Sequence, residues 1–217
     1  ISASSLVRAG VGKVRIIDRD FIEYHNLQRQ VLFDENDIQE GLPKAIAAER
    51  HLKRVNSSVN VEGIVADVNY SNVEKFILDA DLVLDGLDNF ETRFLINDAC
   101  LKHGIPWVYG GAISSSGMTM TIIPGETPCF RCFVADASRR RLTLTCDTAG
   151  VISPAPFIIG SLQTAEAMKI LVGAREEINR HLILVDAWEG TFRRFVISRR
   201  PDCPACCGRY ESLEDRF

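Results

Sequence analysis

The chain has 217 residues, of which 46% are hydrophobic and 25% are charged, and its formal net charge is −4. This is the composition of an ordinary globular protein, and the acidic balance excludes a non-specific nucleic-acid binder, which needs clustered excess Lys and Arg. No apolar stretch reaches the roughly 18 residues that span a bilayer, and the sequence from Ile1 onward shows no signal peptide, so we expect a soluble, cytoplasmic protein with neither a nucleic-acid nor a membrane partner.

The first half of the chain alternates predicted helices and strands. A helix over 2–9 stops at Gly10, a residue suited to the left-handed cap that ends many helices. A β-branched run over 14–17 then ends at Asp18, which is typical of a buried parallel strand. Further helices are predicted over 45–55, 72–78 and 91–103, and further strands over 60–66, 82–84 and 107–109. This alternation indicates an α/β fold with a Rossmann-like, doubly wound, mostly parallel sheet.

The second half of the chain changes character. A strand over 118–123 precedes an apolar helix over 157–172, and two antiparallel strands are predicted over 181–185 and 192–197. Antiparallel strands therefore extend the parallel sheet. Because there is no repeat and no low-complexity linker, we expect a single domain over 1–217.

The start of the chain departs from the usual pattern of a nucleotide-binding sheet. Such a sheet begins with a strand, a glycine-rich turn and a helix. Here the sequence opens in what should be that first helix, and Gly10-Val11-Gly12 precedes a strand instead of following one. We therefore expect the N-terminal strand and its glycine-rich turn to be missing, as in a fragment, and no phosphate-binding glycine can be assigned.

Two C-x-x-C pairs account for four of the seven cysteines. Two such pairs supply the four thiolates of a closed, tetrahedral, structural Zn²⁺ site. A redox pair or loose core thiols are the alternatives, and Cys207 could compete as a ligand. The predicted zinc ligands are Cys129, Cys132, Cys203 and Cys206.

A second group of polar residues follows the strand that ends at Asp18. A carboxylate in this position can hold the ribose hydroxyls of a nucleotide, although acidic residues end many strands without that role. The segment 26–30, Asn-Leu-Gln-Arg-Gln, adds amide and guanidinium donors, and Lys44 adds a second cation at the start of the next helix. Arg and Lys that converge where strands end suit a triphosphate, whereas the plain alternative is a surface ion-pair loop.

A third group follows the strand predicted over 82–84. Asp85 and Asp88 flank the strand end, and Arg93 lies one turn into the next helix. Mg²⁺ that bridges nucleotide phosphates takes one or two carboxylates, so an acidic residue here can be its ligand. The alternative is that Asp88 serves as the helix N-cap, and the two carboxylates could divide these duties.

Taken in order, these motifs resemble the MoeB/ThiF/HesA family, the bacterial relatives of ubiquitin-activating enzymes. The similarity runs from about Leu6 to Gly208, and six motifs in the same order are highly specific. The chain departs from the family in the glycine-rich turn and in the N-terminal segment, which lends an arginine to the neighbouring subunit. The matching motifs are Asp18-x-Asp20, Asn26-Leu-Gln-Arg29-Gln30, Pro43-Lys44, Asp88-Asn89-x-x-Thr92-Arg93 and the two C-x-x-C pairs.

The resemblance implies an adenylating domain with ATP, Mg²⁺ and Zn²⁺ as its cofactors. It implies that Asp18 binds the ribose of ATP, and that Asn26, Arg29 and Lys44 contact the phosphates. Asp88 would hold Mg²⁺ or position the reacting carboxylate. The two C-x-x-C pairs would hold the zinc ion.

Cys146 matches the cysteine that some family members use for thioester, persulfide or acyl-disulfide chemistry. A reactive thiol needs nearby positive charge, which Arg139-Arg140-Arg141 would supply if the loop folds back. An inert loop thiol is the alternative. Cys100 lies inside an apolar helix pattern and is expected to be a small core residue.

The implied reaction is ATP-dependent adenylation of the C-terminal Gly-Gly carboxylate of a ubiquitin-like sulfur-carrier protein of the MoaD/ThiS type. The resemblance also implies a homodimer, with a sulfurtransferase or a cysteine desulfurase as a further partner. The residues expected to carry the chemistry are Arg29, Lys44, Asp88 and Cys146.

Two rival functions are kept beside this one. A catalytically inactive scaffold that only docks the carrier is compatible with the missing glycine-rich turn. An NAD-dependent oxidoreductase shares the fold class, but the sequence supplies no site for hydride transfer. The carrier itself is not identified, because the carriers of molybdopterin, thiamin and tRNA-thiolation pathways share the Gly-Gly tail.

Overall fold

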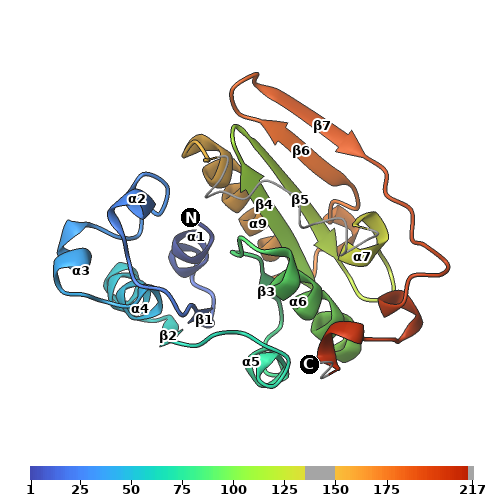
Figure 1. Ribbon diagram of the computed structural model, residues 1–217, viewed down its shortest axis with the longest axis horizontal. Helices are drawn as coiled ribbons and strands as arrows, with labels where there is room; N and C mark the ends of the chain where they lie inside the picture. The colour runs from blue at the N-terminus through green and yellow to red at the C-terminus, as the bar shows by residue number, and fades with distance from the viewer. Residues whose placement is uncertain (135–149, 215–217) are drawn as a thin grey trace. The chain divides into compact units, whose positions relative to one another are not determined.

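The computed structural model describes residues 1–134 and 150–214. The chain divides into two compact units, Ile1–Val68 and Asn69–Phe217, and each is considered by itself (Figure 1). The single domain over 1–217 stays a prediction.

The first unit is built on a parallel pair of strands. Strands β1 and β2 run in register from Lys13 opposite Asn60 to Ile17 opposite Ile64. Parallel strands need a crossover, and here α4 supplies it. In chain order the unit contains α1 (Ser2–Ala9), β1 (Lys13–Ile17), α2 (Tyr24–Leu27), α3 (Glu35–Gln39), α4 (Lys44–Val55) and β2 (Asn60–Ile64).

A small apolar core holds the first unit together. Val7 of α1 and Leu52 of α4 are fully buried against Val59 and Val61. Burying a side chain of this kind contributes roughly 1.5–3 kcal/mol relative to leaving it in water. The helix α4 lies directly on β2, because a Cβ added at Gly63 would come within 2.3 Å of the backbone of α4.

The second unit contains a five-stranded mixed sheet in the order β3-β4-β5-β6-β7. Strands β3 and β4 are parallel, and each later pair is antiparallel. The predicted extension of a parallel α/β arrangement by antiparallel strands is therefore confirmed. The unit contains α5 (Val73–Ile77), β3 (Val83–Leu84), α6 (Phe90–His103), β4 (Trp107–Ile113), β5 (Ser116–Ile122), α7 (Phe130–Phe133), α9 (Pro154–Leu171), η2 (Arg175–Glu177), β6 (Leu182–Asp186), β7 (Thr191–Phe195), η3 (Ala205–Cys207) and η4 (Glu211–Leu213).

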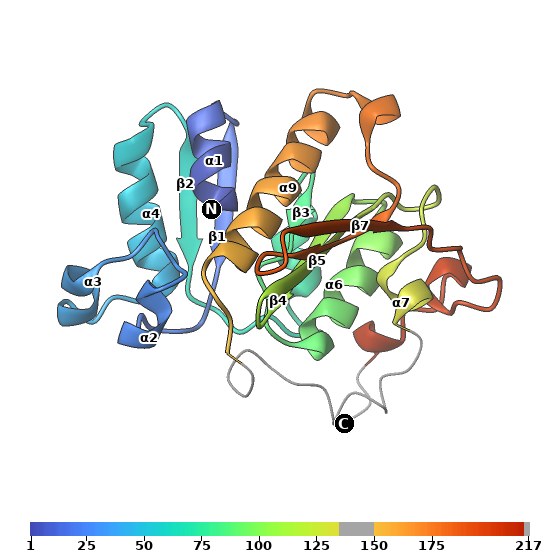
Figure 2. The ribbon, with the colours of Figure 1, turned by 90° about the horizontal axis from the view of Figure 1, so that it is seen from above.

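Helices cover both faces of the sheet in the second unit. Figure 2 shows α9 along one face of β4 and β5, and α6 with α7 on the other. On the α7 side, Trp107 and Tyr109 lie 5.6 and 5.0 Å from the ring of Phe130, measured between centroids. Alternate residues of a strand point to opposite faces, so Val108 and Gly110 face α9.

The predicted elements are present, with ends that differ by a few residues. The largest difference is β4, which continues to Ile113 although Gly110 and Gly111 are poor strand formers. The short helices α2, α3 and α7 were not predicted, because one turn carries too little periodicity.

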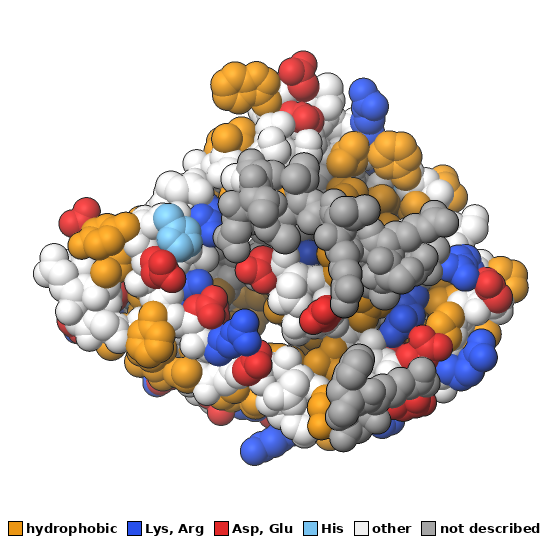
Figure 3. Space-filling model, viewed as in Figure 1, with side chains coloured by type: hydrophobic (Ala, Val, Ile, Leu, Met, Phe, Trp, Pro, Cys, Tyr) orange, Lys and Arg blue, Asp and Glu red, His pale blue; other side chains and the backbone are white. Residues whose placement is uncertain are grey.

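Two further properties of the molecule are the distribution of charge on its surface and the hydropathy of its helices. Figure 3 shows Lys and Arg side chains interspersed with Asp and Glu side chains over the visible face. Among the helices that the structure describes, none is both long and apolar enough to cross a membrane.

Candidate functional site

The four cysteines of the two C-x-x-C pairs converge on one point in the second unit. Their ligand atoms all lie within 4.8 Å of one another. The Sγ atoms of Cys129 and Cys132 are 3.8 Å apart, and those of Cys129 and Cys203 are 3.5 Å apart. The Sγ atoms of Cys132 and Cys206 are 3.6 Å apart.

These separations fit a metal better than a disulfide. A tetrahedral ion with metal–sulfur bonds of about 2.3 Å places its sulfur ligands about 3.8 Å apart, whereas a disulfide bond is about 2.05 Å long. The four cysteines are free thiols. The donor set and its geometry therefore fit the structural Zn²⁺ ion predicted from the spacing.

Mutual contacts and burial shift the pKa values of three of these thiols. A hydrogen bond with Cys129 lowers the pKa of Cys132 to about 4, while that same bond, with burial, raises the pKa of Cys129. Burial also raises the pKa of Cys203 to about 11. A bound dication would favour the thiolate form of its cysteine ligands.

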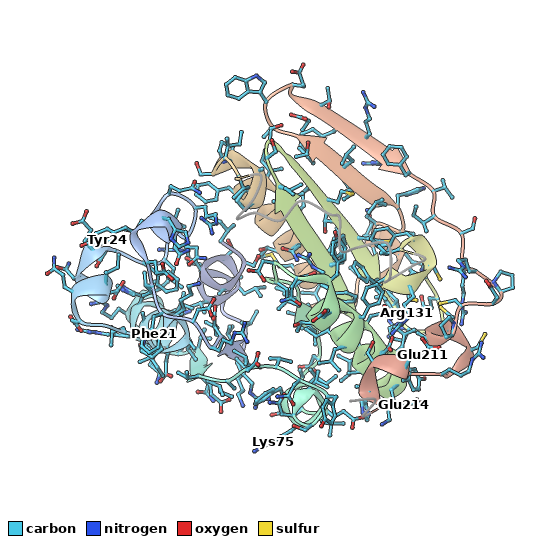
Figure 4. The ribbon with its side chains drawn as sticks, viewed as in Figure 1. Phe21, Tyr24, Lys75, Arg131, Glu211 and Glu214 are labelled. Atoms are coloured by element: carbon cyan, nitrogen blue, oxygen red, sulfur yellow. The ribbon has the colours of Figure 1, made fainter. Side chains whose placement is uncertain are left out.

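Polar contacts tie this cluster to α6 and to η4. Arg131, inside the first C-x-x-C pair, forms a bidentate ion pair with the fully buried Asp98 of α6, with both N–O distances at 2.8 Å. The backbone N–H of Ser212 donates to the same carboxylate at 3.0 Å. Figure 4 shows Arg131 beside Glu211, whose carboxylate is 3.8 Å from the guanidinium. A buried charge with this many partners fixes the cluster rigidly.

In the first unit, two predicted nucleotide-binding residues share a neighbour. Asp18 follows β1 directly, and its Oδ1 accepts a hydrogen bond from the backbone of Asp20 at 2.8 Å. Lys44 opens α4, and its Nζ lies 3.3 Å from Oδ2 of Asp20. The Lys44 side chain is only 11% exposed, so its position is well determined by packing. The structure thus brings Asp18 and Lys44 into one cluster at the carboxyl end of β1.

Asn26 and Arg29 belong to α2 and the turn after it. Asn26 is buried, and its Oδ1 accepts from the backbone N–H of Glu23 at 3.1 Å, which completes a capping box. Arg29 donates to the backbone oxygen of His25 at 2.9 Å. Both side chains therefore have local structural roles, and their contacts with phosphates stay predictions.

In the second unit, Asp85 and Arg93 form a buried ion pair. Arg93 Nε lies 2.9 Å from Asp85 Oδ2, and their side chains are 7% and 0% exposed. Arg93 also donates to the backbone oxygens of Leu87 and, at 3.1 Å, of Gly110. Burial raises the pKa of the Asp85 carboxyl, and the Arg93 guanidinium opposes that rise. Asp85 is thus committed to the fold and is a poor candidate for a metal ligand.

Asp88 has the opposite environment. It is exposed, and its Oδ1 accepts a hydrogen bond from the side-chain amide of Asn89 at 3.3 Å. The alternative role of Asp88 as a helix N-cap is wrong, because Asn89 caps α6 by accepting from the backbone of Thr92 at 2.9 Å. A single exposed carboxylate at a strand end fits the donor set that Mg²⁺ takes beside phosphate oxygens. Its role stays a prediction.

The sequence did not predict a structural role for Gln163, and it named two further cysteines, Cys100 and Cys146. Gln163 of α9 is buried and contacts the end of β3, and the only sequence signal was a polar residue in an apolar helix. Cys100 is fully buried, which confirms it as a small core residue. Cys146 and the run 139–141 lie outside the described residues.

The chain is similar to several proteins of known activity. It is 46% identical to the sulfur carrier protein ThiS adenylyltransferase of Bacillus subtilis, over 94% of the chain and 60% of that protein. It is 38% identical to the SAMP-activating enzyme E1 of Haloferax volcanii, over 97% of the chain and 77% of that protein. It is also 38% identical to a sulfur carrier protein adenylyltransferase of Thermus thermophilus, over 93% of the chain and 75% of that protein.

The fold is also similar to a solved structure. The crystal structure of E. coli MccB with ATP superposes with a TM-score of 0.81 at 25% identity, covering 94% of this chain and 62% of that one. The model of the ThiF family matches residues 1–205. Together with the two relatives that are covered over at least three quarters of their length, this match shows that the chain belongs to the ThiF family.

Proposed function

We propose that the chain adenylates the C-terminal Gly-Gly carboxylate of a ubiquitin-like sulfur-carrier protein of the MoaD/ThiS type and so prepares it for thiocarboxylate formation. The observation that carries this proposal is the 46% identity to the Bacillus subtilis ThiS adenylyltransferase over nearly the whole chain. The chain spans 60% of the length of that relative, so the activity is inferred for the part it covers.

The reaction needs charge neutralisation and positioning more than acid–base chemistry. The carrier carboxylate is already ionised at neutral pH and needs no general base. It must approach the α-phosphate of ATP, so two anions have to be held together. We assign this neutralisation to Arg29 and Lys44, and ribose binding to Asp18. The support from the structure is that Asp20 holds Lys44 near Asp18 at the end of β1.

Asp88 is assigned to the metal side of the reaction. Mg²⁺ would supply charge neutralisation at the phosphates, and Asp88 is the residue that would hold it. Asp88 offers it one exposed carboxylate, and Asp85 with Arg93 fixes the turn from which Asp88 projects. Asp88 is favoured over Asp85 as the metal ligand because Asp88 is exposed, whereas Asp85 is buried in an ion pair with Arg93.

The remaining assignments rest on the resemblance alone. We propose a homodimer located in the cytoplasm, a sulfurtransferase or cysteine desulfurase as the sulfur donor, and Cys146 as a participant in sulfur transfer. The zinc ion would brace the segment around α7 and would take no part in the chemistry, because four thiolates leave no ligand position open.

The proposal is tested by exchange of labelled pyrophosphate into ATP, with purified Bacillus subtilis ThiS as the carrier. We expect exchange that depends on the carrier and disappears when the carrier lacks its two terminal glycines. Carrier binding without exchange would identify a docking scaffold instead. Binding of NAD with no effect of ATP would favour an oxidoreductase.

A further inference from the structure

A buried glutamine of α9 lies against the end of strand β3. Gln163 is 4% exposed. Its Nε2 donates to the backbone oxygen of Asp85 at 2.9 Å and to that of Val108 at 3.0 Å. A side-chain amide has two protons to donate, so Gln163 uses both to join the neighbouring strands β3 and β4.

The strand ladder is weak at this point. Strand β3 has two residues, and Leu84 pairs with Val108 as its last registered partner. One more backbone hydrogen bond follows, from Asp85 N to Val108 O at 3.1 Å. Beyond it the chain leaves the sheet, and the backbone oxygen of Asp85 would be a buried acceptor without a ladder partner. Gln163 supplies the donor that such a group requires.

The backbone of β4 at Gly110 packs directly against the side-chain amide of Gln163. A Cβ added at Gly110 would lie 2.4 Å from the Cδ and Nε2 atoms of Gln163. A glycine inside a strand often marks a position where another group approaches the backbone closely. The amide is therefore enclosed between β4 and α9 and held in one orientation.

The same contact point begins the turn that carries Asp88. Asp85 is held at its backbone by Gln163, and at its carboxylate by Arg93 at 2.9 Å and by the backbone N–H of Leu87 at 2.8 Å. Asp88 follows three residues later and is exposed. Two helices, α6 and α9, thus tether the start of a turn whose tip carries an exposed carboxylate.

We propose that Gln163 is a positioning residue that acts through Asp88, which rests on the adenylation proposed above. By fixing the end of β3, it sets the place of the Asp88 carboxylate before substrate binds. An apolar residue of the same size would fill the same space at α9. Burying an amide instead costs free energy unless the amide is hydrogen-bonded, so a buried glutamine indicates that its donors are needed here. The need arises at the backbone oxygen of Asp85, because Val108 O already accepts from the backbone N–H of Asp85.

The test is a double-mutant cycle with Gln163→Met and Asp88→Asn, measured as pyrophosphate exchange with Bacillus subtilis ThiS. Gln163→Met keeps the length of the side chain and removes its donors. We expect it to lower kcat by about 10- to 100-fold while KM for the carrier changes by less than about twofold, because misplacing a reacting group by about 1 Å has effects of this size. In the Asp88→Asn background, Gln163→Met should cause no further loss.

The matched control is Thr164→Val. Thr164 is the next residue of α9, is equally buried, and donates its hydroxyl to Gly160 of its own helix at 2.7 Å. Removing this hydroxyl perturbs the helix without touching the end of β3. We expect exchange within about twofold of the unsubstituted protein and an unchanged zinc content.

A second readout does not depend on activity. The N–H of Leu87 donates to Asp85 Oδ1, so its hydrogen exchange reports on the turn itself. We expect Gln163→Met to speed this exchange by at least about tenfold, and Thr164→Val to leave it unchanged. If Gln163→Met fails to fold, Gln163→Leu also removes both donors, with a smaller apolar side chain.

Three results would overturn the inference. The first is that Gln163→Met lowers kcat equally with Asp88 and with Asn at position 88. The second is that Gln163→Met changes only KM. The third is that it leaves the hydrogen exchange of the Leu87 N–H unchanged. If the unsubstituted protein shows no pyrophosphate exchange, the proposed function is contradicted. Faster hydrogen exchange of the Leu87 N–H in Gln163→Met would still support the positioning by Gln163.

Discussion

The buried ion pair between Asp85 and Arg93 gives the sharpest prediction about stability. Replacing Arg93 by Met removes the charge while keeping most of the apolar length. Asp85, with a fully buried side chain, would then lack its counter-ion, and Gly110 O would lose its donor at 3.1 Å. The cation would also be lost from its place 5.4 Å from the ring centre of Tyr109.

The expected loss is large. Breaking a buried ion pair by removing one partner costs about 3–5 kcal/mol, because an uncompensated charge stays in the interior. For a unit of this size that loss corresponds to a fall in Tm of roughly 6–20 °C. Removing both charges together, with Asp85→Leu added, should recover part of the loss, because no uncompensated charge remains although the N–H of Leu87 loses its acceptor.

Tryptophan fluorescence during urea unfolding is a suitable assay. The chain has two tryptophans, Trp107 and Trp188, and both belong to the second unit. The signal therefore follows the unit that contains Arg93. The matched control is Arg175→Met, which breaks an exposed ion pair with Glu126 and should change the free energy of unfolding by less than about 1 kcal/mol. A loss below about 1 kcal/mol for Arg93→Met would refute the reasoning.

The remaining predictions concern the zinc cluster and the close approach at β4. Cys203→Ser should lower the zinc content, measured by elemental analysis, to less than about half an equivalent and should destabilise the protein. The control Cys207→Ser, at an exposed cysteine, should keep a full equivalent. Zinc retained in Cys203→Ser would contradict the four-cysteine site. Gly110→Ala should cost about 1–3 kcal/mol because its Cβ would overlap the amide of Gln163, while Gly86→Ala, with open space around it, should stay within about 1 kcal/mol in urea unfolding; equal effects of the two would contradict the enclosed amide.

Much of the fold could be predicted from local patterns. The helix over Ser2–Ala9 ends at Gly10, whose φ of 81° is the left-handed cap that the sequence indicated. The zinc ligands could be found because the pairs have a spacing that few other sites use. The helix cap and each cysteine pair lie within a few neighbouring residues, and that is why they can be read from the chain alone.

The features that could not be predicted depend on contacts between distant segments. Gln163 meets the backbone of Asp85 across 78 residues of chain, and no local pattern reports such a contact. The same approach explains why β4 continues through Gly110, where local preference predicts an earlier end. The roles of Asp88 and Asn89 could not be separated by sequence, since both residue types cap helices well.

The central claim is that the chain adenylates its carrier and that Arg29, Lys44 and Asp88 are each needed for this step. The most direct test is the intact mass of Bacillus subtilis ThiS after one turnover with ATP and Mg²⁺. We predict a carrier species heavier by one adenylyl group (AMP less water), formed by the unsubstituted chain and lost with Arg29→Ala, Lys44→Ala or Asp88→Ala. An undiminished yield of that species from all three variants would contradict the claim.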